Sequence, residues 1–146
     1  MTLEIELKIS AEEMYDFLID NLKRETGKET LHEGLTFKKE LTTKMGKKVE
    51  SEVKVIKLDK NKEYTLKYIN YTGENELNYK IESLDEYLIK LIYKEEYTSD
   101  SFFKKYNNKI TEMFYSYFLR KKRIKMLNSL ENYLIKKREE KVKNND

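Results

Sequence analysis

The sequence of 146 residues contains no cysteine, no proline and no tryptophan, and has only 4 glycines and one histidine. The absence of cysteine excludes disulfides and thiolate metal sites. A lone histidine, His32, excludes zinc sites built from several histidines, and we expect neither a metal nor a cofactor. No stretch is apolar enough to span a bilayer. The N-terminus lacks the basic start and apolar run of a signal peptide, which predicts a cytoplasmic protein.

Charge is abundant. Asp, Glu, Lys and Arg make up 39% of the residues, against about 25% in a typical globular protein. Hydrophobic residues still account for 38%, including 12 Tyr and 6 Phe, which is enough for a core rich in aromatic rings. The length fits one domain. We therefore expect a single domain over residues 1–146, with a frayed tail at 139–146.

The charge is divided unevenly along the chain. Residues 1–100 hold 17 basic and 22 acidic residues, whereas residues 101–146 hold 13 and 5. This asymmetry indicates either an anionic partner or a basic helix packed beside an acidic sheet, and we favour the second interpretation. No helix-turn-helix or aromatic RNA-binding pattern is present, so nucleic acid is not the expected partner. The basic cluster consists of Arg120, Lys121, Lys122, Arg123 and Lys125.

The first third of the chain predicts a strand followed by a helix. Apolar and charged residues alternate over residues 3–9, as in a half-buried strand. Ser10 and Glu13 then have the spacing of a capping box, in which each side chain binds the other residue's backbone amide. The helix that follows is expected to end near Gly27. One further helical turn is expected over residues 28–33.

Five more strands are predicted after this helix. Each candidate alternates apolar and polar residues and is bounded by a short polar turn. Because the connections are so short, we expect a meander of neighbouring antiparallel strands. The strands are expected around residues 35–41, 49–55, 64–68, 77–81 and 89–97.

The last third predicts one long helix without glycine or proline, from Asp100 or Ser101 to about Arg138. A helix over residues 102–138 would be roughly 55 Å long. This is long for a compact domain of this size, whose expected radius of gyration is about 15 Å. We therefore expect it to bend near the basic cluster, to start later, or to overhang and form a homodimer. Its aromatic part, residues 103–118, is expected to form a cavity wall. A membrane partner is not expected, because the apolar stripe of this helix is needed to cover the sheet.

Several segments in this order resemble domain-of-unknown-function family 3284 of low-GC Gram-positive bacteria. That family is similar to the START-like helix-grip (SRPBCC) superfamily, in which a curved antiparallel sheet grips a long C-terminal helix. The resemblance implies a cavity between sheet and helix that often holds an apolar ligand, and it carries over no catalytic residue. The segments are Ser10-Ala11-Glu12-Glu13, Phe17-Leu18-Ile19-Asp20, Glu33-Gly34-Leu35-Thr36, Tyr79-Lys80-Ile81-Glu82, Leu84-Asp85-Glu86, Tyr93-Lys94-Glu95-Glu96-Tyr97, Lys121-Lys122-Arg123 and Met126-Leu127.

The expected fold is therefore α+β: a helix-grip domain in which about six strands wrap around the long C-terminal helix, with a short N-terminal helix after the first strand. Inward-facing tyrosines would give a cavity an aromatic wall with hydroxyl groups, which suits an amphipathic ligand. The alternative is a tightly packed core whose hydroxyls bond elsewhere. The candidate cavity residues are Phe37, Tyr64, Tyr68, Tyr79, Tyr93, Glu95, Phe114 and Tyr117.

Glu95 shares a strand face with Tyr93 and Tyr97 and should point toward the helix. In an apolar cavity its pKa would be raised, and it could act as a general acid or base. The alternative, which we favour, is a carboxylate that lies in water at the end of the strand or is bonded to a tyrosine hydroxyl or to the region of Arg120 and Lys121. The favoured function is a non-enzymatic binding module for a small hydrophobic or amphipathic ligand, and a regulatory role is one form that this function could take. The other hypotheses are a cyclase or hydrolase that uses Glu95 and a cavity tyrosine, and an interaction protein that uses the basic helix.

Overall fold

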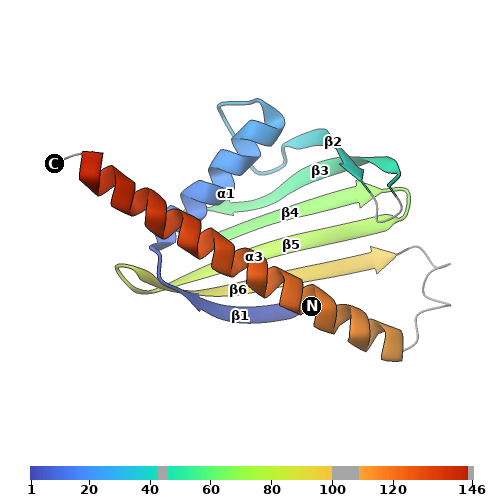
Figure 1. Cartoon of the computed structure of the whole chain (residues 1–146). Helices are drawn as coiled ribbons and strands as arrows, with labels where there is room; N and C mark the ends of the chain where they lie inside the picture. Colours follow the sequence, from blue (N-terminus) through green and yellow to red (C-terminus); the bar gives the residue numbers. More distant parts are fainter. Residues whose placement is uncertain (43–45, 100–108, 145–146) are drawn as a thin grey trace.

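The computed structural model describes residues 1–42, 46–99 and 109–144, and of residues 99 and 109–115 the backbone alone. Figure 1 shows one sheet with both helices on the same face. In chain order the elements are β1 (Thr2–Leu7), α1 (Ala11–Thr26), β2 (Thr36–Thr42), β3 (Lys48–Asp59), β4 (Glu63–Asn70), β5 (Gly73–Asp85), β6 (Leu88–Ser99) and α3 (Lys109–Asn144).

The six strands form one curved antiparallel sheet in the order β1-β6-β5-β4-β3-β2. Strands β2 to β6 follow one another as the predicted meander. Strand β1 closes the other edge by pairing with β6, with Leu3 opposite Tyr93. The predicted α+β helix-grip architecture is confirmed, since a curved sheet of this kind carries a long C-terminal helix on its inner face (Figure 1).

Helix α1 begins and ends as its sequence predicts. The Ser10 Oγ accepts a hydrogen bond of 3.0 Å from the Glu13 amide, and the Ser10 amide donates one of 2.9 Å to Glu13 Oε1. At the other end, Gly27 takes a φ of 68° and its amide donates to the Lys23 carbonyl, a left-handed cap that glycine adopts without strain. The extra helical turn expected over residues 28–33 is wrong, because these residues form only bends and turns.

Helix α3 crosses the sheet diagonally, and its two ends extend past the strands (Figure 1). It is continuous over 36 residues, or about 54 Å, and the bend expected near the basic cluster is not found. The predicted start at Asp100 or Ser101 lies outside the described residues. Residues 139–144, expected to be a frayed tail, are the last turns of the helix. No helix in the described ranges combines the length and the hydropathy of a membrane span.

The core lies between the inner face of the sheet and the two helices. The alternation of the strands sends every second side chain to this face. Helix α1 adds Met14 and Leu22, and α3 adds Leu127 and Leu134. Burial of these four side chains fixes both helices on the sheet, at roughly 1.5 to 3 kcal/mol for each full burial. The fully buried strand residues are Leu3, Leu7, Ser51, Val53, Val55, Ile89, Leu91 and Tyr93.

Candidate functional site

An apolar pocket of about 550 Å³ lies between α1, α3 and strand β5. On each helix, many of the lining residues are three or four positions apart and therefore lie on one face of that helix. Tyr79 of β5 forms the floor. The lining residues are Phe17, Leu18, Asn21, Arg24, Tyr79, Met126, Leu127, Ser129, Leu130 and Tyr133.

A row of three tyrosines supports this floor. Tyr64, Tyr79 and Tyr93 lie opposite one another on β4, β5 and β6. Their rings pack edge to face, with centroids 5.9 Å apart for the first pair and 4.9 Å for the second. Burial raises the pKa of all three phenols above the ordinary value. Each hydroxyl therefore stays neutral near pH 7, and the row forms a rigid aromatic base beneath the pocket.

Of the predicted cavity residues with described side chains, Tyr79 lines the apolar pocket. Tyr64 and Tyr93 are buried in the core next to it. Phe37 and Tyr68 are half-buried against the core, and burial raises the pKa of Tyr68 to about 12. The structure thus groups three of the predicted tyrosines around the pocket and places the other two residues elsewhere on the inner face.

The predicted aromatic wall from the first part of α3 is not what lines this pocket. Tyr117 and Phe118 are 61% and 65% exposed, and the side chain of Phe114 lies outside the described residues. The α3 part of the wall instead comes from residues 126–133.

Glu95 lies in a saturated polar network between β6 and α3. It is only 8% exposed. Arg123 donates to both of its oxygens, from Nε to Oε2 at 3.0 Å and from Nη2 to Oε1 at 3.2 Å. The Tyr93 hydroxyl donates to Oε2 at 2.7 Å, and Asn75 Nδ2 donates to Oε1 at 3.3 Å. This carboxylate does not line the apolar pocket.

Glu95 does not have the raised pKa that an apolar cavity would give it. Burial by itself would raise the pKa, but hydrogen bonds from Arg123 and Tyr93 and the charge of Arg123 outweigh it and lower the pKa. The carboxylate is therefore ionised at neutral pH and has both oxygens occupied. Its arrangement matches the alternative interpretation, in which it bonds to a tyrosine hydroxyl and to the basic region of the helix.

The basic cluster is divided by the same network. Arg123 points inward and is held by Glu95, whose hydrogen bond raises the pKa of the guanidinium. The other four members, Arg120, Lys121, Lys122 and Lys125, are exposed. The basic cluster thus contains one half-buried residue, Arg123, which pairs with the sheet, and four residues on the outer surface of α3.

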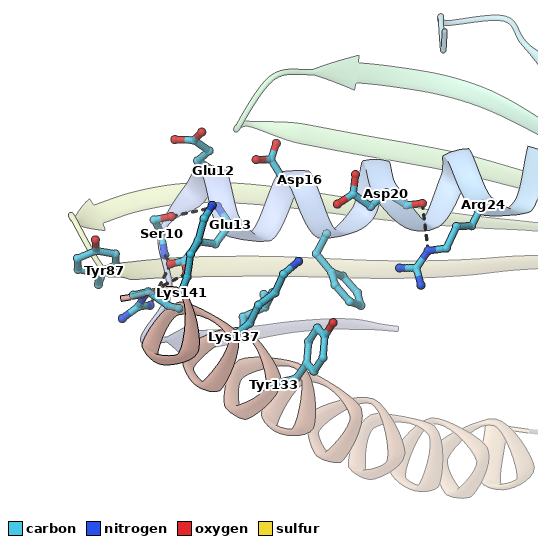
Figure 2. Close-up of a pocket in the computed structure, with 13 residues that line it drawn as sticks. Ser10, Glu12, Glu13, Asp16, Asp20, Arg24, Tyr87, Tyr133, Lys137 and Lys141 are labelled. Atoms are coloured by element: carbon cyan, nitrogen blue, oxygen red, sulfur yellow. Dashed lines mark hydrogen bonds and ion pairs between the residues drawn. The ribbon is translucent and has the colours of Figure 1, made fainter. Parts of the chain in front are cut away.

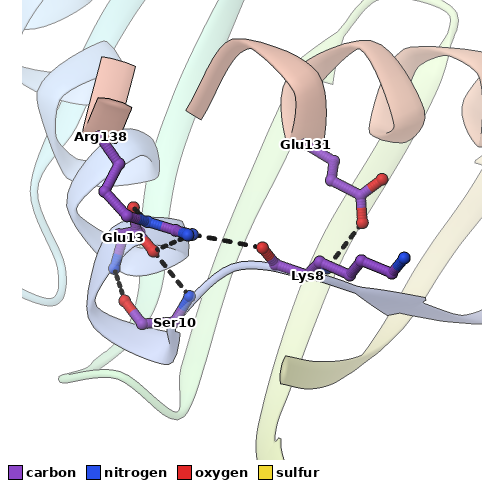
Figure 3. A network of polar contacts seen from close by, with 5 residues as sticks. All are labelled: Lys8, Ser10, Glu13, Glu131 and Arg138. Carbon is purple, nitrogen blue, oxygen red and sulfur yellow. Dashed lines mark hydrogen bonds and ion pairs between the residues drawn. The ribbon is translucent and has the colours of Figure 1, made fainter. Parts of the chain in front are cut away.

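A second two-point ion pair holds the other half of α3 (Figure 3). Arg138 donates to Glu13 from Nε at 3.0 Å and from Nη2 at 2.9 Å. Its guanidinium also lies 3.9 Å from the centre of the Tyr87 ring and donates to the Lys8 carbonyl. Glu131 accepts a hydrogen bond from the Lys8 amide. These contacts join α3 to the turn between β1 and α1.

A charged groove of about 470 Å³ continues from the apolar pocket along the two helices (Figure 2). Phe17, Arg24 and Tyr133 line both spaces. The rings of Phe17 and Tyr133 pack edge to face with centroids 6.1 Å apart. This aromatic pair lies at the junction between the apolar pocket and the charged groove. Besides these three residues, the groove is lined by Ser10, Glu12, Glu13, Asp16, Asp20, Tyr87, Leu134, Lys137, Arg138 and Lys141.

Sequence reasoning missed most of the pocket residues. The predicted cavity residues include none of the α1 residues that line the pocket and none of those from residues 126–133 of α3. On α1, the polar residues Asn21 and Arg24 are the ones to explain. Their spacing from Phe17 continues one face of α1 with polar groups, which is the signal that could have identified them. Among the described residues, no group of three or more His, Asp or Glu side chains is placed to hold a metal ion.

Solved structures share this fold at low sequence identity. A conserved protein from Geobacillus kaustophilus is 15% identical, with a TM-score of 0.61 over 92% of this chain and 94% of that one. A START superfamily protein from Mycobacterium smegmatis is 11% identical, with a TM-score of 0.58 over 93% and 97%. The Zhui aromatase/cyclase from Streptomyces sp. R1128 is 14% identical, with a TM-score of 0.52 over 69% and 68%. These similarities show the fold alone.

A comparison with curated proteins gives no match. The model of the family described as Domain of unknown function (DUF3284) matches residues 1–116, which is most of the chain. This match agrees with the order of sequence segments and with the START-like fold. The chain belongs to the DUF3284 family.

Proposed function

We propose that the protein is a non-enzymatic binding module that holds a small hydrophobic or amphipathic ligand between α1, α3 and β5. The apolar pocket over Tyr79 carries this proposal. Its volume of about 550 Å³ falls within the range of small-molecule sites. Its lining is mostly aliphatic and aromatic, with a few polar groups that could orient a ligand.

The arrangement around the pocket supports binding more than catalysis. Some proteins of this fold are named as enzymes, including the Zhui aromatase/cyclase. Acid–base chemistry here would need a carboxyl group that reaches a ligand, and Glu95 is held by Arg123 and Tyr93 outside the pocket lining. The neutral phenol of Tyr79 can instead donate a hydrogen bond to a bound molecule.

The test combines native mass spectrometry of the purified protein with titration of the uncharged fluorescent probe N-phenyl-1-naphthylamine. Ser129 is exposed and lines the pocket, so Ser129→Trp should fill the space without disturbing the core. Asn128 is exposed on the same turn and does not line the pocket, so Asn128→Trp is the matched control. We expect Ser129→Trp to weaken probe binding by at least about tenfold, a loss near 1.4 kcal/mol.

Two results would contradict the proposal. One is a wild-type protein that neither carries a co-purified small molecule nor binds the probe. The other is equal probe affinity in Ser129→Trp and Asn128→Trp, which would place the bound probe outside this pocket.

A second candidate function is self-association through the exposed face of α3. Tyr117 and Phe118 pack against each other with centroids 5.7 Å apart and are mostly exposed, whereas large aromatic side chains are commonly buried in cores or interfaces. Light scattering after size-exclusion chromatography tests this. A dimer that Phe118→Ser converts to monomers supports it, and a wild-type monomer at every concentration rejects it.

A further inference from the structure

Arg24 has a special position in the pocket. It is the one charged residue among the ten that line the apolar space. It also lines the charged groove, so its side chain lies where the two spaces join. A charged group at the end of an apolar pocket orients an amphipathic ligand, because the body and the polar head then bind at different places.

The contacts of Arg24 leave its charge uncompensated among the described residues. Its Nη2 donates to Asn21 Oδ1 at 2.7 Å, and its Nε donates to the Asp20 backbone carbonyl at 3.4 Å. Both acceptors are neutral, and the Asp20 carboxylate does not pair with it within the described part of the chain. A guanidinium has five N–H donors, so three remain for a ligand.

Two other arginines of the chain show what such a group binds when a partner is present. Arg123 and Arg138 each hold a carboxylate through two parallel hydrogen bonds. The planar guanidinium matches a carboxylate or a similar oxyanion in this geometry. We infer that the ligand of this pocket is an amphipathic anion, with its acidic group on Arg24 and its apolar body over Tyr79 and Leu127. The inference rests on the proposed function and adds the chemical class of the ligand.

The carboxylates of the charged groove offer a competing head-group site of opposite sign. Glu12, Asp16 and Asp20 line it, together with Lys137 and Lys141. In Figure 2 these three carboxylates lie on the side of α1 away from α3, and none of them lines the apolar pocket. A ligand whose body fills the apolar space therefore reaches Arg24 first, which favours an anionic over a cationic head.

The experiment compares three molecules with the same ten-carbon body: decanoate, decan-1-ol and decylamine. Each is used below its aggregation limit at pH 7.5 to displace N-phenyl-1-naphthylamine. We expect decanoate to bind the wild-type protein at least about tenfold more tightly than decan-1-ol, as charge-assisted hydrogen bonds to a carboxylate require. Arg24→Gln should remove this difference and leave decan-1-ol affinity unchanged, while Arg24→Lys should retain part of it.

Lys28→Gln is the matched control, since Lys28 is exposed, carries the same charge and lines neither pocket. The wild-type comparison alone decides the charge of the head group even if a variant fails to fold, and the variants decide whether Arg24 binds it. Equal affinity for decanoate and decan-1-ol, or tighter binding of decylamine, overturns the anionic head group while the proposed function stands. Failure of the probe and all three molecules to bind overturns the proposed function itself. Equal losses of decanoate affinity in Arg24→Gln and Lys28→Gln would show that the preference depends on net charge alone, and would reject Arg24 as the head-group site.

Discussion

Arg123 of α3 and Glu95 of β6 form a two-point ion pair across the interface between the helix and the sheet. Fifteen residues later, Arg138 forms the same kind of pair with Glu13 of α1. The residues of α3 that line the apolar pocket, 126–133, lie between these two pairs. The helical wall of the pocket is therefore fixed at both of its ends.

Glu95→Gln should destabilise the protein by about 2 to 4 kcal/mol, because it leaves the inward-facing Arg123 without its charge partner. The free energy of unfolding in urea measures this. In Glu95→Gln/Arg123→Met we expect part of the loss to be recovered, since the unpaired charge is gone. The surface pair Lys90–Glu4 is the control, and Lys90→Gln should cost less than about 1 kcal/mol. Similar losses of unfolding free energy in Glu95→Gln and Lys90→Gln would show that the buried Glu95 pair contributes no more to stability than a surface pair.

Acid should weaken the attachment of α3. In the folded protein the pKa of Glu13 and of Glu95 is lowered below the ordinary value of 4.5: burial opposes the change, and hydrogen bonds from the arginines dominate. Their stabilisation is thus complete above that value and is lost as the pH falls through the lower folded-state pKa values. We expect the stability difference between wild type and Glu13→Gln/Glu95→Gln to be constant between about pH 6 and 8 and to shrink below about pH 4.5. A difference that grows in acid would contradict the lowered pKa values.

Alkali should ionise the tyrosine row only when the protein unfolds. Burial raises the pKa of Tyr64, Tyr79 and Tyr93 in the folded state above the ordinary 10.0. Their stabilisation is therefore present below pH 10 and is lost as the pH rises above it, since the unfolded chain releases these protons first. Absorbance at 295 nm should rise for these residues together with the loss of far-ultraviolet circular dichroism.

Replacement of one row member tests this assignment. Tyr79→Phe should reduce the absorbance change that accompanies unfolding. Tyr71 is 76% exposed, so Tyr71→Phe should leave that change as it is in the wild type. The same reduction in both variants would mean that Tyr79 is as accessible to hydroxide as a surface tyrosine.

Ser10→Ala should cost about 1 kcal/mol, because it removes the N-cap of α1. Glu13→Gln should cost more, about 1.5 to 3 kcal/mol, since Glu13 completes the capping box and also accepts two hydrogen bonds from Arg138. The double variant should lose less than the sum, because both residues act in one capping box. Glu12→Gln, at an exposed position of the same turn, should cost only a few tenths of a kcal/mol. Urea denaturation measures all four, and additive losses would show that the two residues act independently.

Local sequence rules predicted most of the elements. The alternation of each strand, the Ser10–Glu13 spacing and the position of Gly27 depend on neighbouring residues, and each is confirmed. The failed helical turn over residues 28–33 shows the limit of such rules, because Leu31 is the one residue of that short segment that packs against the core, too little to stabilise a separate helix. One long C-terminal helix was predicted, and α3 runs through the basic cluster without the bend that was one of three alternatives for its length. Arg123, within that cluster, finds its compensating charge on β6 rather than within the helix.

The pocket depended on distant contacts that the sequence does not encode locally. Alternation correctly turned Glu95 inward, but its state is set by Arg123, 28 residues away. Apolar periodicity marks the faces of α1 and α3 that meet, yet it cannot show where their side chains fail to fill the space above Tyr79. The tyrosines were predicted as lining, but the register places three of them side by side, and the position of the two helices leaves Tyr79 as the one that lines the pocket.

The pairing of β1 with β6 also has a consequence for how the chain folds. Thr2 pairs with Lys94, so the first strand of the sheet waits for the last one to be made. At a synthesis rate of about 5 to 20 residues per second, this interval lasts roughly 5 to 20 s. During it the apolar faces of β1 and α1 have no complete sheet to cover them, and transiently exposed apolar surface of this kind favours aggregation. The same long-range pairing predicts slow refolding in vitro compared with a helical bundle of equal size.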